Sequence, residues 1–282
     1  MKDLVIGCST GYNWSVLKYW VNSLNMCGFS GDKVLILMNC NKYTIDKLVA
    51  AGISIIGFRY NEQGDLVYSS NLPVHVERFL HIYNFLKSNN QYRYVVTTDV
   101  KDVVFQKNPI EFIENSIKKK KLILSSESML YKDEPWGNQN LLDTFGSYFH
   151  AIFKENAIYN VGVLAGTSES IRDLCSNIFQ MSLNRPIPIV DQSTFNFMIS
   201  QEPYKSTCLY TGSEDGWACQ LGTTFDPSKI EDFRPYLLEE TPKYNGKTFT
   251  TSKGVDYYIV HQYDRTPFKT EVELKYGGCL DE

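Results

Sequence analysis

Apolar strands alternate with amphipathic helices along the first hundred residues, and this order restricts the fold more than any other feature. Four short apolar runs bounded by polar turns are expected to be strands: 4–8, 33–38, 53–58 and 94–98. Between them, apolar residues at helical spacing predict helices: 16–26, 45–51 and 74–87. This alternation predicts an α/β layered fold with a mainly parallel central sheet. Because ligands bind beyond the carboxyl ends of such strands, the turns 9–13 and 99–102 are expected at the site.

The second half of the chain has a weaker pattern. Three further apolar runs are expected to be strands: 122–124, 161–164 and 257–260. Residues 130–160 are rich in aromatic residues and turn formers, and we expect them to be less regular. We find neither an internal repeat nor a linker, so we expect a single domain over residues 1–282, long enough to bury one large core.

Two carboxylates directly follow the strand 94–98, and they are the strongest chemical signal. Asp99 and Asp102 lie at the end of a buried strand, where unpaired charge is costly. A hard cation such as Mg²⁺ or Mn²⁺, bound by these oxygens together with substrate phosphates, would account for them. Aspartate is also a common turn residue, so the pair taken alone is equally consistent with a simple turn.

The longer segment around this pair resembles a known family. The run Thr98-Asp99-Val100-Lys101-Asp102-Val103-Val104-Phe105-Gln106-x-x-Pro109 is similar to the metal-site segment of GT-A-fold glycosyltransferases. It is most like the small soluble type known from bacteria, plants and large algal viruses. The family's usual signature is Asp-x-Asp, whereas here Lys101 takes the third place and Asp102 is the second acid. Which of the two carboxylates contacts the metal directly is therefore left open.

The resemblance implies a fold, an activity and a cofactor. The fold is GT-A-like and Rossmann-type, with residues 1–110 binding the nucleotide sugar and an irregular acceptor-side half at 111–282. The activity is transfer of a hexosyl or pentosyl group from a nucleotide diphosphate donor, expected to be a UDP-sugar, to a glycan or glycoprotein acceptor. The cofactor is Mn²⁺ or Mg²⁺ at Asp99 and Asp102, which would neutralise the leaving diphosphate.

Later segments match motifs of the family in chain order. Asn160 and Gly162 resemble its Asn-x-Gly strand on the acceptor side, where a glycine would let a sugar approach the backbone, although an ordinary strand explains them equally well. Asp191 and Gln192 resemble the Asp-Gln pair that opens a helix near the reacting carbon, and Asp191 also suits a helix N-cap. His261 matches by position the late histidine that is a third metal ligand in glycogenin-like relatives; otherwise it is a structural residue.

Three cations are expected near the diphosphate. Arg265 and Lys269 follow the late histidine and would clamp phosphate oxygens. Arg78, on the helix before the metal strand, is a candidate partner for Asp99 or the phosphates, and an ion pair without function explains it equally well.

The turn after the first strand is where this fold receives the nucleoside. Backbone groups near Ser9 and Thr10 would read the edge of the base, and the ring of Tyr12 would stack on uracil. The alternative is an ordinary strand-to-helix turn with Asn13 as the cap.

The implied mechanism has two forms, and two other functions compete with it. In an inverting reaction Asp191 would deprotonate the acceptor hydroxyl, whereas in a retaining reaction Asp191 and Gln192 would flank the reacting face. A nucleotidyltransferase is expected to have a basic, Gly-rich loop after the first strand, and residues 7–11 contain neither Lys nor Arg. A non-catalytic carbohydrate-binding protein would not need this set of carboxylates and histidine in register.

Composition narrows the class of partner and the compartment. A formal net charge of -4 argues against a protein that holds nucleic acid through phosphate contacts. We see neither a signal peptide nor an apolar stretch approaching the roughly 20 residues of a transmembrane segment. The cysteine count, 7, is odd, and the cysteines form no C-x-x-C pair. We therefore expect a cytoplasmic protein, of a bacterial or virus-infected cell.

Overall fold

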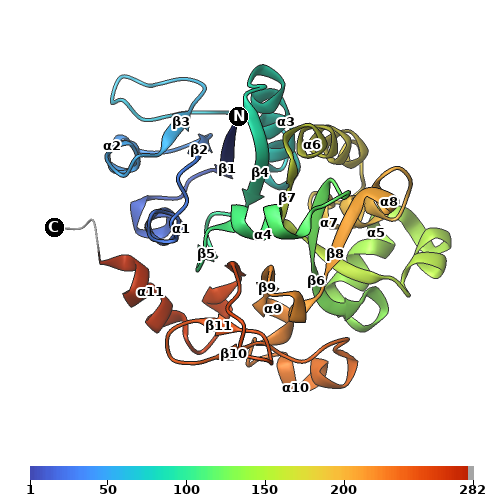
Figure 1. Cartoon of the computed structure of the whole chain (residues 1–282). Coiled ribbons are helices and arrows are strands. Elements are labelled where there is room, and N and C mark those ends of the chain that lie inside the picture. Colours follow the sequence, from blue (N-terminus) through green and yellow to red (C-terminus); the bar gives the residue numbers. More distant parts are fainter. Residues whose placement is uncertain (279–282) are drawn as a thin grey trace.

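A seven-stranded sheet lies at the centre of the computed structural model, which describes residues 1–278 (Figure 1). In spatial order its strands are β3 (Ser54–Ile56), β2 (Asp32–Leu37), β1 (Lys2–Ser9), β4 (Tyr92–Thr98), β7 (Ala157–Thr167), β6 (Leu122–Leu130) and β8 (Cys208–Thr211). β7 is antiparallel to both of its neighbours, and the other adjacent pairs are parallel. The expected α/β fold with a mainly parallel sheet is confirmed. Residues 279–282 of the expected domain lie outside the described residues.

Helices cover both faces of this sheet. On one face lie α1 (Trp14–Met26), α2 (Lys42–Ala50) and α4 (Pro109–Ser116); on the other lie α3 (Val74–Ser88), α6 (Ser168–Ser182) and α7 (Asp191–Ile199). Each helix packs its apolar side chains against the strands, as the helical spacing predicted. The central strands are buried on both faces, which explains their continuous apolar sequences.

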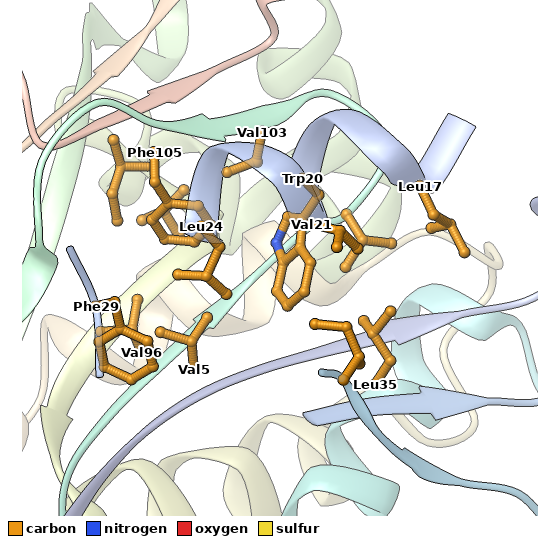
Figure 2. Close-up of a cluster of buried hydrophobic side chains, with 14 of the residues drawn as sticks. Val5, Leu17, Trp20, Val21, Leu24, Phe29, Leu35, Val96, Val103 and Phe105 are labelled. Carbon is orange, nitrogen blue, oxygen red and sulfur yellow. The ribbon is translucent and has the colours of Figure 1, made fainter. Parts of the chain in front are cut away.

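The packing of α1 fixes the end of the strand that precedes the two aspartates. Figure 2 shows Trp20 and Leu24 of α1 lying against Val5 and Val96 of the sheet. The indole Nε1 of Trp20 donates a hydrogen bond of 2.8 Å to Thr98 Oγ1, the last residue of β4. The strand end is thus held from the helical layer, so the turn that follows it starts from a fixed point.

A second, three-stranded sheet brings distant segments to this turn. It consists of β5 (Val103–Phe105), β12 (Ile259–His261) and β9 (Ala218–Gln220), with β12 in the middle. β12 pairs antiparallel with β5 and parallel with β9. The strand expected at 257–260 is shifted toward the C-terminus, and its last residue, His261, lies opposite Val103.

Short helices and strands make up much of the remaining chain. Four of them are 3₁₀ helices, at Tyr131–Asp133, Ser213–Asp215, Arg234–Tyr236 and Tyr263–Arg265. The others are the helices α8 (Tyr204–Thr207), α9 (Leu221–Thr224), α10 (Ile230–Phe233) and α11 (Lys269–Gly277), and the strands β10 (Lys243–Tyr244) and β11 (Phe249–Thr250). None of the helices within residues 1–278 combines the length and the apolar character that crossing a bilayer requires.

The segment 130–160, expected to be less regular, differs from that expectation. It is mostly helical: α5 (Pro135–Phe153) consists of two helical parts that meet at a kink at Gly146, where φ is 80°. The aromatic residues that suggested irregularity are a helical stripe: Phe145, Phe149 and Phe153 are spaced four apart and pack on one another, and the first two contact Phe197 of α7.

Candidate functional site

Asp99, Asp102 and His261 form a cluster at the carboxyl end of β4. One ligand atom from each lies within 4.8 Å of the others, and His261 Nε2 is 3.5 Å from both Asp99 Oδ2 and Asp102 Oδ1. The pairing of β12 with β5 creates this arrangement, and the backbone N–H of Gln262 donates to the carbonyl oxygen of Asp102 at 2.7 Å. Gln262 has a left-handed φ of 63°, which turns the chain sharply after the histidine. Two oxygens and one nitrogen are a donor set that Mn²⁺ accepts.

The ring of His261 is oriented for metal binding by groups behind it. Its Nδ1 is 2.7 Å from Gln220 Oε1, and the amide nitrogen of Gln220 donates to Ser125 Oγ at 2.7 Å. With the amide oxygen as acceptor, Nδ1 carries a proton, so in the neutral ring it is Nε2 whose lone pair faces the aspartates. Such an orientation is typical of histidines that bind metal.

The charged side chains in and around the cluster shift one another's pKa values. Burial opposes ionisation of Asp99, but the Arg78 guanidinium, followed by His261, holds the pKa of this carboxyl well below its usual range. Burial likewise disfavours an imidazolium, yet Asp102 and then Asp99 raise the pKa of His261 to about 10. Asp99 is therefore ionised at neutral pH, and the histidine must release a proton before it can bind a cation.

Because Gly162 has no side chain, the side chains of the cluster can occupy the space beside it. A Cβ at this position would lie 2.6 Å from His261 Cε1, 2.7 Å from Asp99 Oδ2 and 2.9 Å from Asn160 Oδ1. The glycine therefore makes room for the side chains of the cluster, and the expectation that it also lets a sugar approach stays a prediction. The backbone there is also fixed, since the Gly162 carbonyl oxygen accepts from Asp99 N–H and its N–H donates to Asn160 Oδ1.

Arg78 connects the cluster to the predicted catalytic carboxylate. Its Nη1 is paired with Asp99 Oδ1, and its Nη2 donates to Asp191 Oδ2 at 2.9 Å. Asp191 is not the N-cap that its sequence position suggested: it is the first residue of α7, after Val190, and its side chain points to the arginine. Burial raises the pKa of Asp191, and the charge of Arg78 opposes this shift.

Two adjoining cavities open at the cluster. The central cavity, about 390 Å³, is lined by the predicted catalytic residues Asp191 and Gln192, the predicted acceptor-side residues Asn160 and Gly162, and the predicted phosphate-binding Arg265. The β1 cavity, about 250 Å³, is lined by the turn after β1, with Ser9, Thr10 and Tyr12. Arg78, Asp99, Asp102 and Arg265 line both. The cluster therefore lies between the two cavities.

The surroundings of two lysines bear on the predicted site. Lys269, expected to clamp phosphate, lies outside both cavities at the start of α11 and pairs with Glu273 at 3.8 Å. Lys269 is the first residue of α11, and Glu273 lies one helical turn further along the same helix, so the two side chains can pair. Lys101, the residue that interrupts the family's signature, points to Asp264 at 3.3 Å.

Sequence reasoning missed two buried carboxylates in the central cavity. Glu127 accepts a hydrogen bond of 2.7 Å from Asn160 Nδ2, and burial raises its pKa against the effect of that bond. Glu134 caps α5, accepting from Gly137 N–H at 2.5 Å. The available signal was the change in β6 from an apolar run to polar residues at Ser125, which an ordinary buried strand does not need.

Comparison with known proteins finds a similar fold among solved structures. No protein-family model and no curated protein matches the chain. The apo structure of WbbM, a bifunctional glycosyltransferase, matches with a TM-score of 0.57 and 12% sequence identity over 98% of this chain and 52% of that one. The chain thus spans about half the length of that protein. At this identity the likeness concerns the fold: the chain has a mixed α/β fold that is also found in a glycosyltransferase.

Proposed function

We propose that the chain is a metal-dependent glycosyltransferase that moves a sugar from a UDP-sugar to a hydroxyl group of a glycan or glycoprotein. The observation that carries the proposal is the cluster of Asp99, Asp102 and His261 between two cavities. One cavity is lined by the turn after β1, where the nucleoside is expected, and the other contains carboxylates suited to the transfer. The fold shared with WbbM supports the same conclusion.

The residues of the cluster fit a divalent cation. The side chains offer two carboxylate oxygens and an oriented imidazole nitrogen, and Gly162 keeps their common space free of a side chain. A bound Mn²⁺ or Mg²⁺ would supply positive charge next to the diphosphate as the glycosidic bond breaks. Asp99 and Asp102 would hold that ion, with His261 as the third protein ligand.

The donor is proposed to lie with its nucleoside in the β1 cavity and its diphosphate at the cluster. Ser9 Oγ and Arg78 Nε, both at this cavity, are buried without a hydrogen-bond partner within residues 1–278. Tyr12 keeps a ring 37% exposed at the same cavity, available for stacking on a base. Arg265 lines both cavities and is the cation best placed for phosphate oxygens.

Two carboxylates compete for the role of base in the transfer. Asp191 is paired with Arg78, whose charge favours the ionised, weakly basic form. Glu127 faces the same cavity, and it accepts a hydrogen bond from the neutral amide of Asn160. Burial raises the pKa of both carboxyl groups, as is typical of a general base, so the difference between them lies in their partners. We propose that Asp191 and Gln192 flank the reacting face, and that Glu127 is the stronger candidate for taking the proton if the reaction inverts.

A single series of measurements tests the function. UDP should bind with Mn²⁺ present and lose affinity after chelation, and UDP-sugars should be slowly hydrolysed or transferred in a metal-dependent way. Asp102→Asn should remove both properties while the unfolding temperature shows an intact fold. Release of pyrophosphate from a nucleoside triphosphate and a sugar phosphate would instead indicate a nucleotidyltransferase. Glycan binding without nucleotide binding would indicate a carbohydrate-binding protein.

A further inference from the structure

A third cavity extends the central one away from the metal cluster. This Trp136 cavity, about 230 Å³, is lined by Trp136, Gln139, Asn140, Asp143 and the segment 187–189. Trp136 and Ile189 also line the central cavity, so the two hollows share a wall. The β1, central and Trp136 cavities therefore adjoin in that order.

The backbone of Trp136 is held in place while its ring stays accessible. The residue follows Pro135 at the start of α5, and its N–H faces the carboxylate of Glu134 that caps the helix. Its side chain is nevertheless 50% exposed. Single exposed aromatic residues are common on protein surfaces, so exposure alone carries little weight. What distinguishes this ring is that it lines two adjoining cavities and stands on a capped helix end.

The wall opposite Trp136, formed by the apolar segment 187–189, is also held in place by hydrogen bonds. Asn140 Nδ2 donates to the carbonyl oxygen of Ile189 at 2.6 Å, and Asn140 Oδ1 accepts from Ser193 Oγ at 2.6 Å. These bonds tie the apolar segment 187–189 to both α5 and α7. At the rim, the amide of Gln139 donates to Asp143 at 2.8 Å, so polar oxygens and an amide edge the cavity.

We propose that the Trp136 cavity is a subsite for the second sugar of the acceptor, so that the acceptor is an oligosaccharide rather than a free monosaccharide or a small alcohol. A pyranose has an apolar face of C–H groups and an equatorial belt of hydroxyl groups. The first matches the indole and the 187–189 wall, and the second matches the polar rim. The proposal rests on the proposed function, because it takes the central cavity as the place of transfer.

The test measures how affinity depends on glycan length. Wild-type protein saturated with UDP and Mn²⁺ is titrated calorimetrically with gluco-, galacto-, manno- and N-acetylglucosamine oligomers of one, two and three units. Trp136→Ala, Trp136→Phe and Tyr148→Ala are titrated in parallel. Tyr148 is a matched control, because it is an exposed aromatic residue on the same helix and lines none of the three cavities.

We expect at least one series to bind about tenfold more tightly as a disaccharide than as a monosaccharide. Trp136→Ala should abolish that gain, Trp136→Phe should keep most of it, and Tyr148→Ala should keep all of it. The inference is overturned if no oligomer binds, if affinity does not depend on length, or if Trp136→Ala behaves as the wild type. The UDP titration in the same preparations is a separate readout: its failure refutes the proposed function, whereas normal UDP binding with no length dependence refutes only the subsite.

Discussion

Replacing Gly162 by alanine should prevent the cluster of Asp99, Asp102 and His261 from binding a cation, although none of these three residues is itself replaced. The new Cβ would meet the His261 ring, the Asp99 carboxylate and the Asn160 amide at 2.6, 2.7 and 2.9 Å. All three distances are shorter than a carbon contact of about 3.5 Å, so at least one group must move. The backbone has little freedom to yield, because it bonds Asp99 on one side and Asn160 on the other.

The size of the effect follows from which group moves. His261 is held from behind by Gln220, so Asp99 is the group expected to shift. Disturbing the groups that orient metal ligands typically lowers metal affinity about 10- to 100-fold. Overpacking of a buried site costs about 1–3 kcal/mol of folding free energy. We expect both effects in Gly162→Ala, with the loss of metal affinity exceeding what the loss of stability explains.

Calorimetric titration with Mn²⁺, combined with thermal unfolding, measures the two effects separately. Gly222→Ala is the matched control in the same cavity, because its Cβ would meet the side-chain ends of Gln262 and Arg265 at 2.4 and 2.7 Å rather than a metal ligand. That variant should keep its Mn²⁺ affinity and lose affinity for UDP. Wild-type Mn²⁺ affinity in a folded Gly162→Ala protein would show that the three side chains do not share one ion.

Four further predictions follow from the site. Asp99→Asn and Asp102→Asn should each lose Mn²⁺ binding and turnover while the fold stays intact. EDTA should abolish the activity of the wild type, and added Mn²⁺ should restore it. Activity that survives chelation would contradict the metal site. UDP should bind more tightly than GDP or CDP by calorimetry, and Tyr12→Ala should remove the difference, whereas equal affinities would refute base stacking. Glu127→Gln should lower turnover by about 10²-fold and keep the affinity for UDP. Asp191→Asn should also lower turnover. If turnover falls only in the Asp191 variant, Asp191 is the base. The pKa of His261 is raised to about 10, so this residue must lose a proton before it can bind a cation. Mn²⁺ affinity should therefore fall by about tenfold for each pH unit below that value. A pH-independent affinity would argue against histidine ligation.

Local sequence patterns predicted the elements that depend on local periodicity. The strands and helices of the first hundred residues correspond closely to those in the structure, because each combines a period with a turn signal. The pair Asp99 and Asp102 was found for the same reason, since a charged doublet after a buried strand is visible in one window. His261 required the family resemblance, because its approach to the pair depends on β12 pairing with β5, more than 150 residues away in the chain.

The parts that were missed depend on contacts between distant segments. Glu127 acquires its role from Asn160 across the β6–β7 pairing, and Gln220 from its position beside His261 in the small sheet. Neither residue stands in a local motif. Lys269 was chosen for its charge and chain position, but the start of α11 directs it to Glu273. Helix α5 was missed because its aromatic stripe was interpreted as composition instead of as spacing.

The wall formed by Trp136 and the segment 187–189 bears on how the choice of acceptor could change between related sequences. These residues lie outside the metal cluster and outside the turn after β1, and they come from a helix start and a connecting loop on the surface. Substitutions and insertions are tolerated best in such segments. Under the proposed function, descendants of one ancestor could therefore exchange acceptors by altering this wall while inheriting an unchanged donor site. Replacement of residues 183–190 by a loop of different sequence should accordingly change the preferred acceptor and keep the preferred nucleotide.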